Sequence, residues 1–455
     1  MRKSKEVFIC QNCGASSPKW QGQCAGCGEW NTLLAELQQA NPRKSAGQPL
    51  AGRTDASSSL EAQAMLESPR LATGSSELDR VLGGGLVPGS VTLIGGDPGI
   101  GKSTLMLQAA AALNGGGAVL YTTGEESLQQ VALRARRLGL KSTAARLLAE
   151  TCVEDIMGAA LSLGARVLIV DSIQTMHSER IEAVPGAVSQ LRECTAELVR
   201  FAKARGTAVL LVGHVTKEGQ IAGPRVLEHM VDTVLYFESD TGSRFRVLRS
   251  VKNRFGAANE IGVFAMLEQG LREVTNPSAI FLSRHAEPVA GSVITVMREG
   301  TRSLLIEVQV LADASLGQNP RRVAVGIDGN RLTMLLAVAH RHAGMQLQGQ
   351  DVFANVVGGV RLAETAGDLA IVMAARSSLR DTPVANSLVA FGELGLAGEI
   401  RPVPFGEERL REAAKHGFKL AVVPEANVPK RPPEGMTVRG VTRLSQALDG
   451  PHGGP

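Results

Sequence analysis

The feature that most constrains this chain is a glycine-rich run at residues 96–103, which reads GDPGIGKS. It fits the pattern G-x-x-x-x-G-K-[ST], in which the backbone N–H groups of a glycine-rich turn curl around a phosphate. Lys102 is expected to reach the β- and γ-phosphates, and Ser103 to hold Mg²⁺. The alternative is a chance glycine-rich turn. However, an apolar run (SVTLIG) precedes this segment and a helical pattern (KSTLMLQAAAAL) follows it, which would place the phosphates at a helix N-terminus.

The expected ligands of this loop are ATP and Mg²⁺. Residues 167–171 (VLIVD) read as a buried strand that ends in an acid, so Asp171 is expected to order Mg²⁺ together with Ser103. This ending is weak evidence alone, because many buried strands end in Asp, but it gains weight downstream of a phosphate loop. The residues expected to bind the nucleotide are Gly96, Asp97, Pro98, Gly99, Ile100, Gly101, Lys102, Ser103 and Thr104.

Two neighbouring glutamates, in the sequence GEES, are candidates for activating the attacking water. We assign Glu125 to this role, because a carboxylate at a strand end can polarise water, and we expect Glu126 to cap the helix that starts at Ser127. Either glutamate could be the cap. His214 follows a later apolar run and is expected to sense the γ-phosphate, although a structural core histidine is the other interpretation.

Two segments from His214 onward carry positive charge. Residues 214–225 (HVTKEGQIAGPR) resemble a mobile loop suited to DNA contact, or else a solvated surface turn. Lys252 and Arg254, in the sequence KNRFG, are two residues apart, so on an extended segment both point to one side. This spacing suits a pair of cations that contact a phosphate. If the phosphate belongs to a neighbouring subunit, they are fingers acting in trans; otherwise they form an ordinary basic turn.

Four of the six cysteines lie near the N-terminus in the pattern C-x2-C-x10-C-x2-C. Two such pairs supply four thiolates to a tetrahedral Zn²⁺, so Cys10, Cys13, Cys24 and Cys27 are the expected ligands. Two disulfides are the alternative, which a cytosolic compartment disfavours. The pattern leaves no open ligand position, so we expect the zinc to be structural. The remaining two cysteines lie in apolar helical contexts and are expected in the core.

The composition is that of a globular chain without a membrane span. Of its 455 residues, 44% are hydrophobic and 20% charged, and no apolar run is long enough to cross a bilayer. The first residues lead into cysteines instead of an apolar signal core, so a cytoplasmic location is expected. The net charge of +4 permits binding to nucleic acid. Aromatic residues make up only 3%, so contacts of Lys and Arg with phosphates, more than base stacking, would dominate DNA binding.

The pattern along the chain predicts three folded regions. A zinc ribbon at 1–37 precedes a linker at 38–68, which is rich in Gln, Ala, Ser, Pro and Gly. Apolar runs alternate with helical patterns over 69–274, which predicts an α/β domain with a mostly parallel sheet covered by helices on both faces. A second αβ region follows at 275–448, and a Gly- and Pro-rich tail at 449–455 is expected to be disordered.

The motifs together resemble the RadA/Sms family of bacterial DNA-repair ATPases. The similarity covers nearly all of the chain except the linker and the tail. It implies a RecA-like ATPase core in which Lys102, Ser103, Glu125 and Asp171 fall on the ATPase positions, and Lys252 and Arg254 on the family's KNRFG cations. The stretches that carry it are the two cysteine pairs, LGGGLVPGS at 82–90, GDPGIGKST at 96–104, GEES at 124–127, VDSIQT at 170–175, GHVTKEG at 213–219 and KNRFG at 252–256.

The C-terminal region resembles the proteolytic domain of Lon, through AGEIRPVP at 397–404 and RLREAAKHGFKLAVVP at 409–424. The serine-lysine dyad of that domain is missing. No serine lies in ETAGD at 364–368, and Glu407 stands where the lysine is expected. A glutamate cannot be the neutral amine base that a serine nucleophile needs. The domain is therefore expected to be a scaffold for assembly or DNA binding. Its arginines could face DNA or solvent: Arg321, Arg322, Arg341, Arg361 and Arg376.

The resemblance implies an ATP-driven motor that processes recombination intermediates by branch migration or helicase activity. It also implies binding to single-stranded and branched DNA without sequence preference, a homo-hexameric ring, and partners such as the RecA recombinase. Two alternatives remain open. One is a RecA-type recombinase that forms filaments, against which the Lon-like region argues. The other is an ATP-switched adaptor that binds DNA without moving along it. An ATP-dependent protease is disfavoured by the missing dyad.

Overall fold

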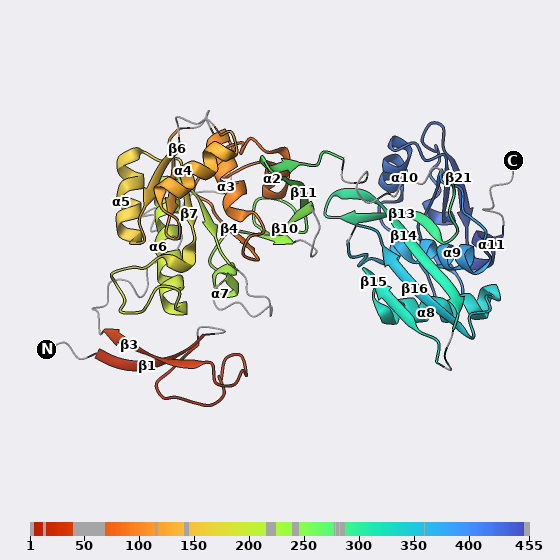
Figure 1. The fold of residues 1–455 in the computed structure, drawn as a ribbon, viewed down its shortest axis with the longest axis horizontal. Coiled ribbons are helices and arrows are strands. Elements are labelled where there is room, and N and C mark those ends of the chain that lie inside the picture. The colour runs from red at the N-terminus through yellow and green to blue at the C-terminus, as the bar shows by residue number, and fades with distance from the viewer. Residues whose placement is uncertain are drawn as a thin grey trace, which may run out of the picture. The chain divides into compact units, whose positions relative to one another are not determined.

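The computed structural model describes residues 4–11, 15–39, 69–113, 117–140, 145–214, 224–238, 245–276, 278, 282, 287–315, 317, 319–358 and 360–449. The chain divides into two compact units, one running through Thr275 and the other starting at Asn276 (Figure 1). Within the described residues, no helix is both long and apolar enough to cross a membrane.

The N-terminal segment is a small antiparallel sheet. Its central strand β1 (Ser4–Cys10) pairs with β2 (Ser16–Ser17) on one side and with β3 (Leu33–Gln39) on the other. Its apolar core contains only the buried side chains of Cys10, Cys24 and Leu33 with a few partly buried neighbours. So small a core supplies little folding free energy, which is typical of a module that a metal ion stabilises.

The rest of the first unit is built on one nine-stranded sheet in the order β12-β11-β10-β9-β4-β8-β7-β5-β6. The strands from β9 to β6 in this order run parallel, and the three at the other edge are antiparallel. The bounds are β4 Val91–Gly96, β5 Val119–Thr123, β6 Ala145–Ala149, β7 Val167–Asp171, β8 Ala208–Val212, β9 Thr233–Glu238, β10 Phe245–Asn253, β11 Ile261–Leu267 and β12 Gly270–Glu273.

Helices cover both faces of this sheet (Figure 1). One apolar layer packs side chains of α2, α3 and α4 on the sheet, and the other packs those of α5, α6 and α7. Burial on both faces explains why β4, β5, β7 and β8 read as continuous apolar runs. The bounds are α2 Ser76–Leu82, α3 Lys102–Ala112, α4 Leu128–Arg137, α5 Val153–Leu163, the 3-10 turn η1 Ile173–Thr175, α6 Val188–Arg205 and α7 Pro224–Glu228.

The second unit is a mixed sheet of seven strands with helices, in the order β15-β16-β14-β13-β17-β20-β21. A separate two-stranded ribbon joins β18 to β19. The strands are β13 Ser292–Glu299, β14 Arg302–Ala314, β15 Arg322–Val325, β16 Gln350–Val356, β17 Leu388–Ala390, β18 Glu393–Leu394, β19 Ile400–Arg401, β20 Leu420–Pro424 and β21 Thr437–Val441. The helices are α8 Gly329–Ala343, η3 Thr365–Gly367, α9 Asp368–Leu379, α10 Gly406–Lys415, η4 Glu425–Asn427 and α11 Leu444–Leu448.

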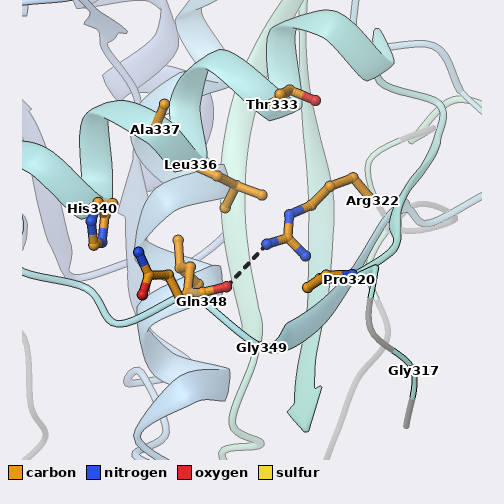
Figure 2. Close-up of a pocket in the computed structure, with 10 residues that line it drawn as sticks. Gly317, Pro320, Arg322, Thr333, Leu336, Ala337, His340, Gln348 and Gly349 are labelled. Atoms are coloured by element: carbon orange, nitrogen blue, oxygen red, sulfur yellow. Dashed lines mark hydrogen bonds between the residues drawn. The ribbon is translucent and has the colours of Figure 1, made fainter. Parts of the chain in front are cut away.

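A pocket of about 520 Å³ opens beside α8 in this unit (Figure 2). Arg322 projects into it, but its guanidinium donates to the backbone carbonyl oxygens of Leu347, at 3.0 Å, and Gln350. Arg376 is likewise buried and donates to the carbonyl of Leu448. Arg376 is therefore held inside the domain, and the expectation that it faces DNA or solvent is wrong. Arg322 is partly buried and lines the pocket, while its guanidinium holds two loop carbonyl oxygens. The other three candidates are exposed: Arg321, Arg341 and Arg361.

Candidate nucleotide-binding site

The glycine-rich loop between β4 and α3 is shaped to hold an anion. Gly96 and Gly101 have φ angles of +147° and +117°, in the region that favours glycine. A Cβ atom on Gly101 would also lie 2.8 Å from the methyl group of Met266. Gly101 is the N-cap of α3 and provides no side-chain cap, so the N–H groups of the first helical turn are available to a phosphate.

Lys102 begins α3 and is buried, with 3% of its surface exposed. Its ammonium group donates to the carbonyl oxygens of Gly96, at 2.6 Å, and Asp97, at 2.9 Å. Burial lowers the pKa of Lys102 to about 8, although the negative charges of Asp171, Asp97 and Glu125 oppose this shift. The ammonium group is therefore influenced by the charges of two carboxylates that the sequence assigned to metal binding and catalysis, Asp171 and Glu125.

Asp171 ends β7 and is held by a residue that the sequence analysis did not identify. The hydroxyl group of Tyr121, on the neighbouring strand β5, donates a hydrogen bond to Oδ2 of Asp171. Burial, followed by the Asp171 charge, raises the pKa of Tyr121 well above its usual value. The sequence signal that could have identified Tyr121 is its position within an apolar strand. A phenol buried there needs a hydrogen-bond partner. The oxygen atoms of Asp171 and Ser103 are of the kind that Mg²⁺ prefers.

Glu125 lies next to the end of β7. Its Oε1 accepts a hydrogen bond from the Ser172 hydroxyl group and is 3.3 Å from Nε2 of His214. Glu126 instead pairs with Arg134 of α4. The expectation that Glu126 caps the helix is wrong: the cap is the hydroxyl group of Ser127, which accepts from the backbone N–H of Gln130.

The carboxyl ends of β7 and β8 carry two further polar groups. Gln174 donates from Nε2 to the carbonyl oxygen of His214 at 3.3 Å. Its Oε1 and the His214 Nδ1 are buried and have no hydrogen-bond partner within the described part of the chain. Buried polar atoms normally have partners, so this end of the sheet is suited to a polar ligand. The segment after His214, residues 215–223, lies outside the described residues, as does the side chain of Arg225.

The two cations of KNRFG contact their own subunit. Lys252 lies within β10 and donates from Nζ to the carbonyl oxygens of Glu228, at 2.7 Å, and Val231, at 2.8 Å. Nη1 of Arg254 is 3.1 Å from Oδ1 of Asp232, and 54% of the Arg254 side chain is exposed. Both side chains therefore contact one turn, between α7 and β9. Burial lowers the pKa of Lys252, and the nearby Arg254 charge lowers it further.

The zinc-ribbon cysteines converge as their spacing predicts for a metal site. The sulfur atoms of Cys10, Cys24 and Cys27 lie within 4.8 Å of one another, and those of Cys10 and Cys27 are 3.7 Å apart. Zn–S bonds of about 2.3 Å in a tetrahedron place two sulfurs about 3.8 Å apart, so the cluster fits Zn²⁺. The separation is far too long for a disulfide between Cys10 and Cys27. Cys13 lies outside the described residues.

The residues at the Lon-like dyad positions form ion pairs and hydrogen bonds. Glu364 accepts two hydrogen bonds, each 2.7 Å long, from the fully buried guanidinium of Arg409. The hydroxyl group of Thr365 donates to Glu393 at 2.7 Å. Glu407 is exposed and pairs with Arg411 on the same helix. Among the described residues 364–368 there is no serine, and position 407 is a glutamate, so neither dyad position carries the expected residue.

Comparison with known proteins identifies the family. The chain is 57% identical to the DNA repair protein RadA of Pseudomonas aeruginosa over 99% of both chains. It is 56% identical to the Escherichia coli protein of the same name, over 98% of each, and 50% identical to that of Bacillus subtilis, over 98% and 99%. The chain belongs to the RadA family. The resemblance found in the sequence motifs is therefore confirmed across the whole length.

Family models match three separate parts of this RadA family member. They are described as a rubredoxin metal binding domain at residues 8–34, an AAA domain at 56–220 and subunit ChlI of Mg-chelatase at 331–427. The chain thus combines a zinc ribbon, a P-loop ATPase core and a C-terminal domain similar to subunit ChlI of Mg-chelatase. A solved structure titled as the RadB recombinase is 23% identical, covers 45% of this chain and 99% of its own, and has a TM-score of 0.36.

Proposed function

We propose that this chain is a DNA-dependent ATPase that processes recombination intermediates by ATP-driven branch migration as an oligomeric ring in the cytoplasm. The observation that carries the proposal is the phosphate loop itself, whose buried Lys102 donates only to loop carbonyl oxygens among the described residues and so is available to a phosphate. The family supports a role in DNA repair, because the full-length relatives are named DNA repair proteins. Partnership with recombination proteins such as the RecA recombinase belongs to the same proposal.

The chemistry assigned to the site is attack of water on the γ-phosphorus, which breaks its bond to the oxygen that bridges the β- and γ-phosphates and releases ADP and inorganic phosphate. Lys102 would exchange its contacts with Gly96 and Asp97 for the β- and γ-phosphate oxygens, which its positive charge stabilises. Glu125, fixed by Ser172 and His214, would orient the water and polarise it. Mg²⁺, when bound at Ser103 and Asp171, supplies charge neutralisation between the phosphates.

Arg254 is the proposed finger for the nucleotide of a neighbouring subunit. Its half-exposed guanidinium can leave Asp232, whereas Lys252 is held by two carbonyl oxygens and is better assigned to positioning. Mixing Arg254→Ala with Lys102→Ala protein tests the finger. Mixed rings contain some interfaces with an intact Arg254 and an intact Lys102, so ATPase activity should partly return. Two results together would show that KNRFG is a DNA-contact segment instead. One is that ATPase activity does not return although subunit exchange is verified, and the other is that Arg254→Ala protein alone has lost DNA binding.

The C-terminal domain is proposed to be a scaffold without protease activity. The exposed arginines Arg321, Arg341 and Arg361 are its candidates for contact with DNA phosphates. Such binding should weaken steeply with salt, because each neutralised phosphate releases counterions. An ATP-switched adaptor is the second candidate, since nucleotide-site geometry is the same for a switch and a motor.

The deciding experiment is a branch-migration assay on a four-way DNA junction, with ATP, without ATP, and with Lys102→Ala protein. ATP-dependent movement of the junction by wild-type protein alone is the expected result. Tight binding to the junction and ATP hydrolysis without movement would favour the adaptor. Cleavage of a casein substrate, measured in parallel, would contradict the scaffold assignment.

A further inference from the structure

The short helix α7 is linked to the phosphate loop through one side-chain hydrogen bond. The hydroxyl group of Tyr236, on β9, donates to Oε1 of Glu228, the last residue of α7, at 2.7 Å. Tyr236 is paired in register with Gly95, the residue before the loop, because β9 runs beside β4. The connection joins segments that lie more than a hundred residues apart in sequence.

The ring of Tyr236 lies directly against the phosphate-loop strand. A Cβ atom on Gly95 would be 2.5 Å from Cε1 and 2.8 Å from Cδ1 of this ring, so only glycine leaves room for it. The next residue, Gly96, has its carbonyl oxygen bonded to the Lys102 ammonium group. Because the ring takes the space that a side chain at position 95 would fill, a shift of the ring is expected to displace Gly95 and Gly96, and with them the carbonyl oxygen that Lys102 binds.

The rest of the turn after α7 is held firmly at both ends. The carbonyl oxygen of Glu228 accepts from Lys252, and the buried side chain of Leu227 lies in the core beneath the helix. The backbone N–H of Asp232 donates to the carbonyl oxygen of Val91 in β4, and the Asp232 carboxylate accepts from the backbone N–H of Val91. A displacement of α7 is therefore transmitted to β4 and β9 instead of being absorbed in a flexible connection.

We propose that Glu228 and Tyr236 are positioning residues that transmit the position of α7 to the phosphate loop. This inference rests on the proposed function, namely that DNA stimulates ATP hydrolysis. The segment that the sequence predicts to contact DNA, residues 214–225, ends within the first turn of α7. DNA binding moves α7, and Glu228 then pulls on the Tyr236 hydroxyl group. The ring of Tyr236 in turn shifts Gly95 and Gly96. This shift releases Lys102 toward the phosphates.

The variant Tyr236→Phe separates this role from packing, because it keeps the ring on Gly95 and removes only the hydroxyl group. Hydrolysis without DNA should stay within about twofold of wild type, while the DNA-stimulated rate falls about tenfold, the effect expected of one hydrogen bond to a charged group. The affinity for a DNA junction and the melting temperature should not change. Glu228→Ala should reproduce this pattern, whereas Glu228→Gln keeps the accepting oxygen and should retain most of the stimulation.

The matched control is Glu238→Gln, at the end of the same strand, where the exposed carboxylate binds Arg249 at 3.1 Å. It should leave the stimulation intact. The double variant Tyr236→Phe with Glu228→Ala should be no worse than either single variant, since both remove one interaction.

Four outcomes overturn the proposal. Normal stimulation of Tyr236→Phe and Glu228→Ala would mean that the bond transmits nothing. Equal loss of the basal and stimulated rates would make the bond structural, and loss of junction binding would make these residues DNA contacts. If wild-type hydrolysis does not respond to DNA, both the link and the proposed function fail. If the wild type responds and the variants respond equally, only the link fails.

Discussion

Each of the two units of this protein contains a buried cationic side chain, and the two differ in whether a carboxylate pairs with it. Lys102 in the ATPase unit donates only to the carbonyl oxygens of Gly96 and Asp97, and forms no ion pair with a carboxylate among the described residues. Arg409 in the C-terminal unit is equally buried but forms a two-bond ion pair with Glu364. A buried cation without a carboxylate partner is ready to accept an anionic ligand, whereas a paired one holds a fold together.

The largest expected effect is that of Lys102→Ala, which removes the cation assigned to the phosphates. ATP hydrolysis should fall by about a thousandfold or more, because the site loses its fixed positive charge. The melting temperature should stay the same or rise, since the buried ammonium group is costly and its pKa is already lowered. A colorimetric phosphate assay and thermal denaturation check both results. Turnover near the wild-type level would remove this loop from the mechanism.

Glu125→Gln should lower hydrolysis about a hundredfold to a thousandfold while ATP still binds. The amide keeps the shape of the side chain but loses the charge that polarises water. Glu126→Gln is the matched control, because Glu126 pairs with Arg134 on α4 and should be dispensable for hydrolysis. Single-turnover hydrolysis and binding of a fluorescent ATP analogue separate the two steps. The reverse ranking of the variants would mean that the two glutamates are assigned backwards.

Arg409→Ala should give the opposite pattern to Lys102→Ala, with lost stability and preserved nucleotide binding. Breaking a buried pair leaves Glu364 without its partner and costs about 3 kcal/mol of unfolding free energy. Urea denaturation measures this cost, and the ATP-analogue titration serves as the functional readout. Glu407→Gln, which affects an exposed pair on the same helix, should not change stability measurably. An unchanged unfolding midpoint in Arg409→Ala would refute the contrast between the two cations.

The smallest expected effect is the pH dependence of ATP binding. Free Lys102 has a pKa near 8, and bound phosphates raise it, so binding takes up a proton wherever the free lysine is neutral. Affinity should therefore fall as pH rises, by about fourfold between about pH 7 and pH 8.5. Calorimetry in buffers of different ionisation enthalpy would detect the proton uptake near pH 8. Affinity independent of pH over this range would show that Lys102 is fully charged before ATP binds.

Much of the architecture was accessible from sequence, because it depends on contiguous residues. The predicted strand at 167–171 is β7 residue for residue, and the helix predicted at 102–113 ends one residue earlier in the structure. The cysteine spacing likewise predicted the cluster of Cys10, Cys24 and Cys27. Local patterns succeed here since strand burial, a helix start after a glycine turn and metal-ligand spacing are set within a few residues.

The partners of individual side chains could not be predicted in the same way. Glu126 was expected to cap a helix, but Ser127 does so, because its hydroxyl group is placed to accept from Gln130 while Glu126 reaches Arg134. Arg322 and Arg376 were considered for the DNA-facing surface, yet both donate to backbone carbonyl oxygens within the domain. The sequence shows which residues are charged, but burial in the folded structure decides whether their side chains contact solvent.

The sequence by itself determined that this chain has a phosphate loop, a strand ending in Asp171 and a zinc ribbon. Only the tertiary structure decided that Tyr121 holds Asp171, that Lys252 binds the turn after α7, and that Tyr236 lies against Gly95. The physical reason is strand order. These contacts exist because β5 lies beside β7 and β9 beside β4, and such pairings of distant segments are fixed by the packing of the whole sheet.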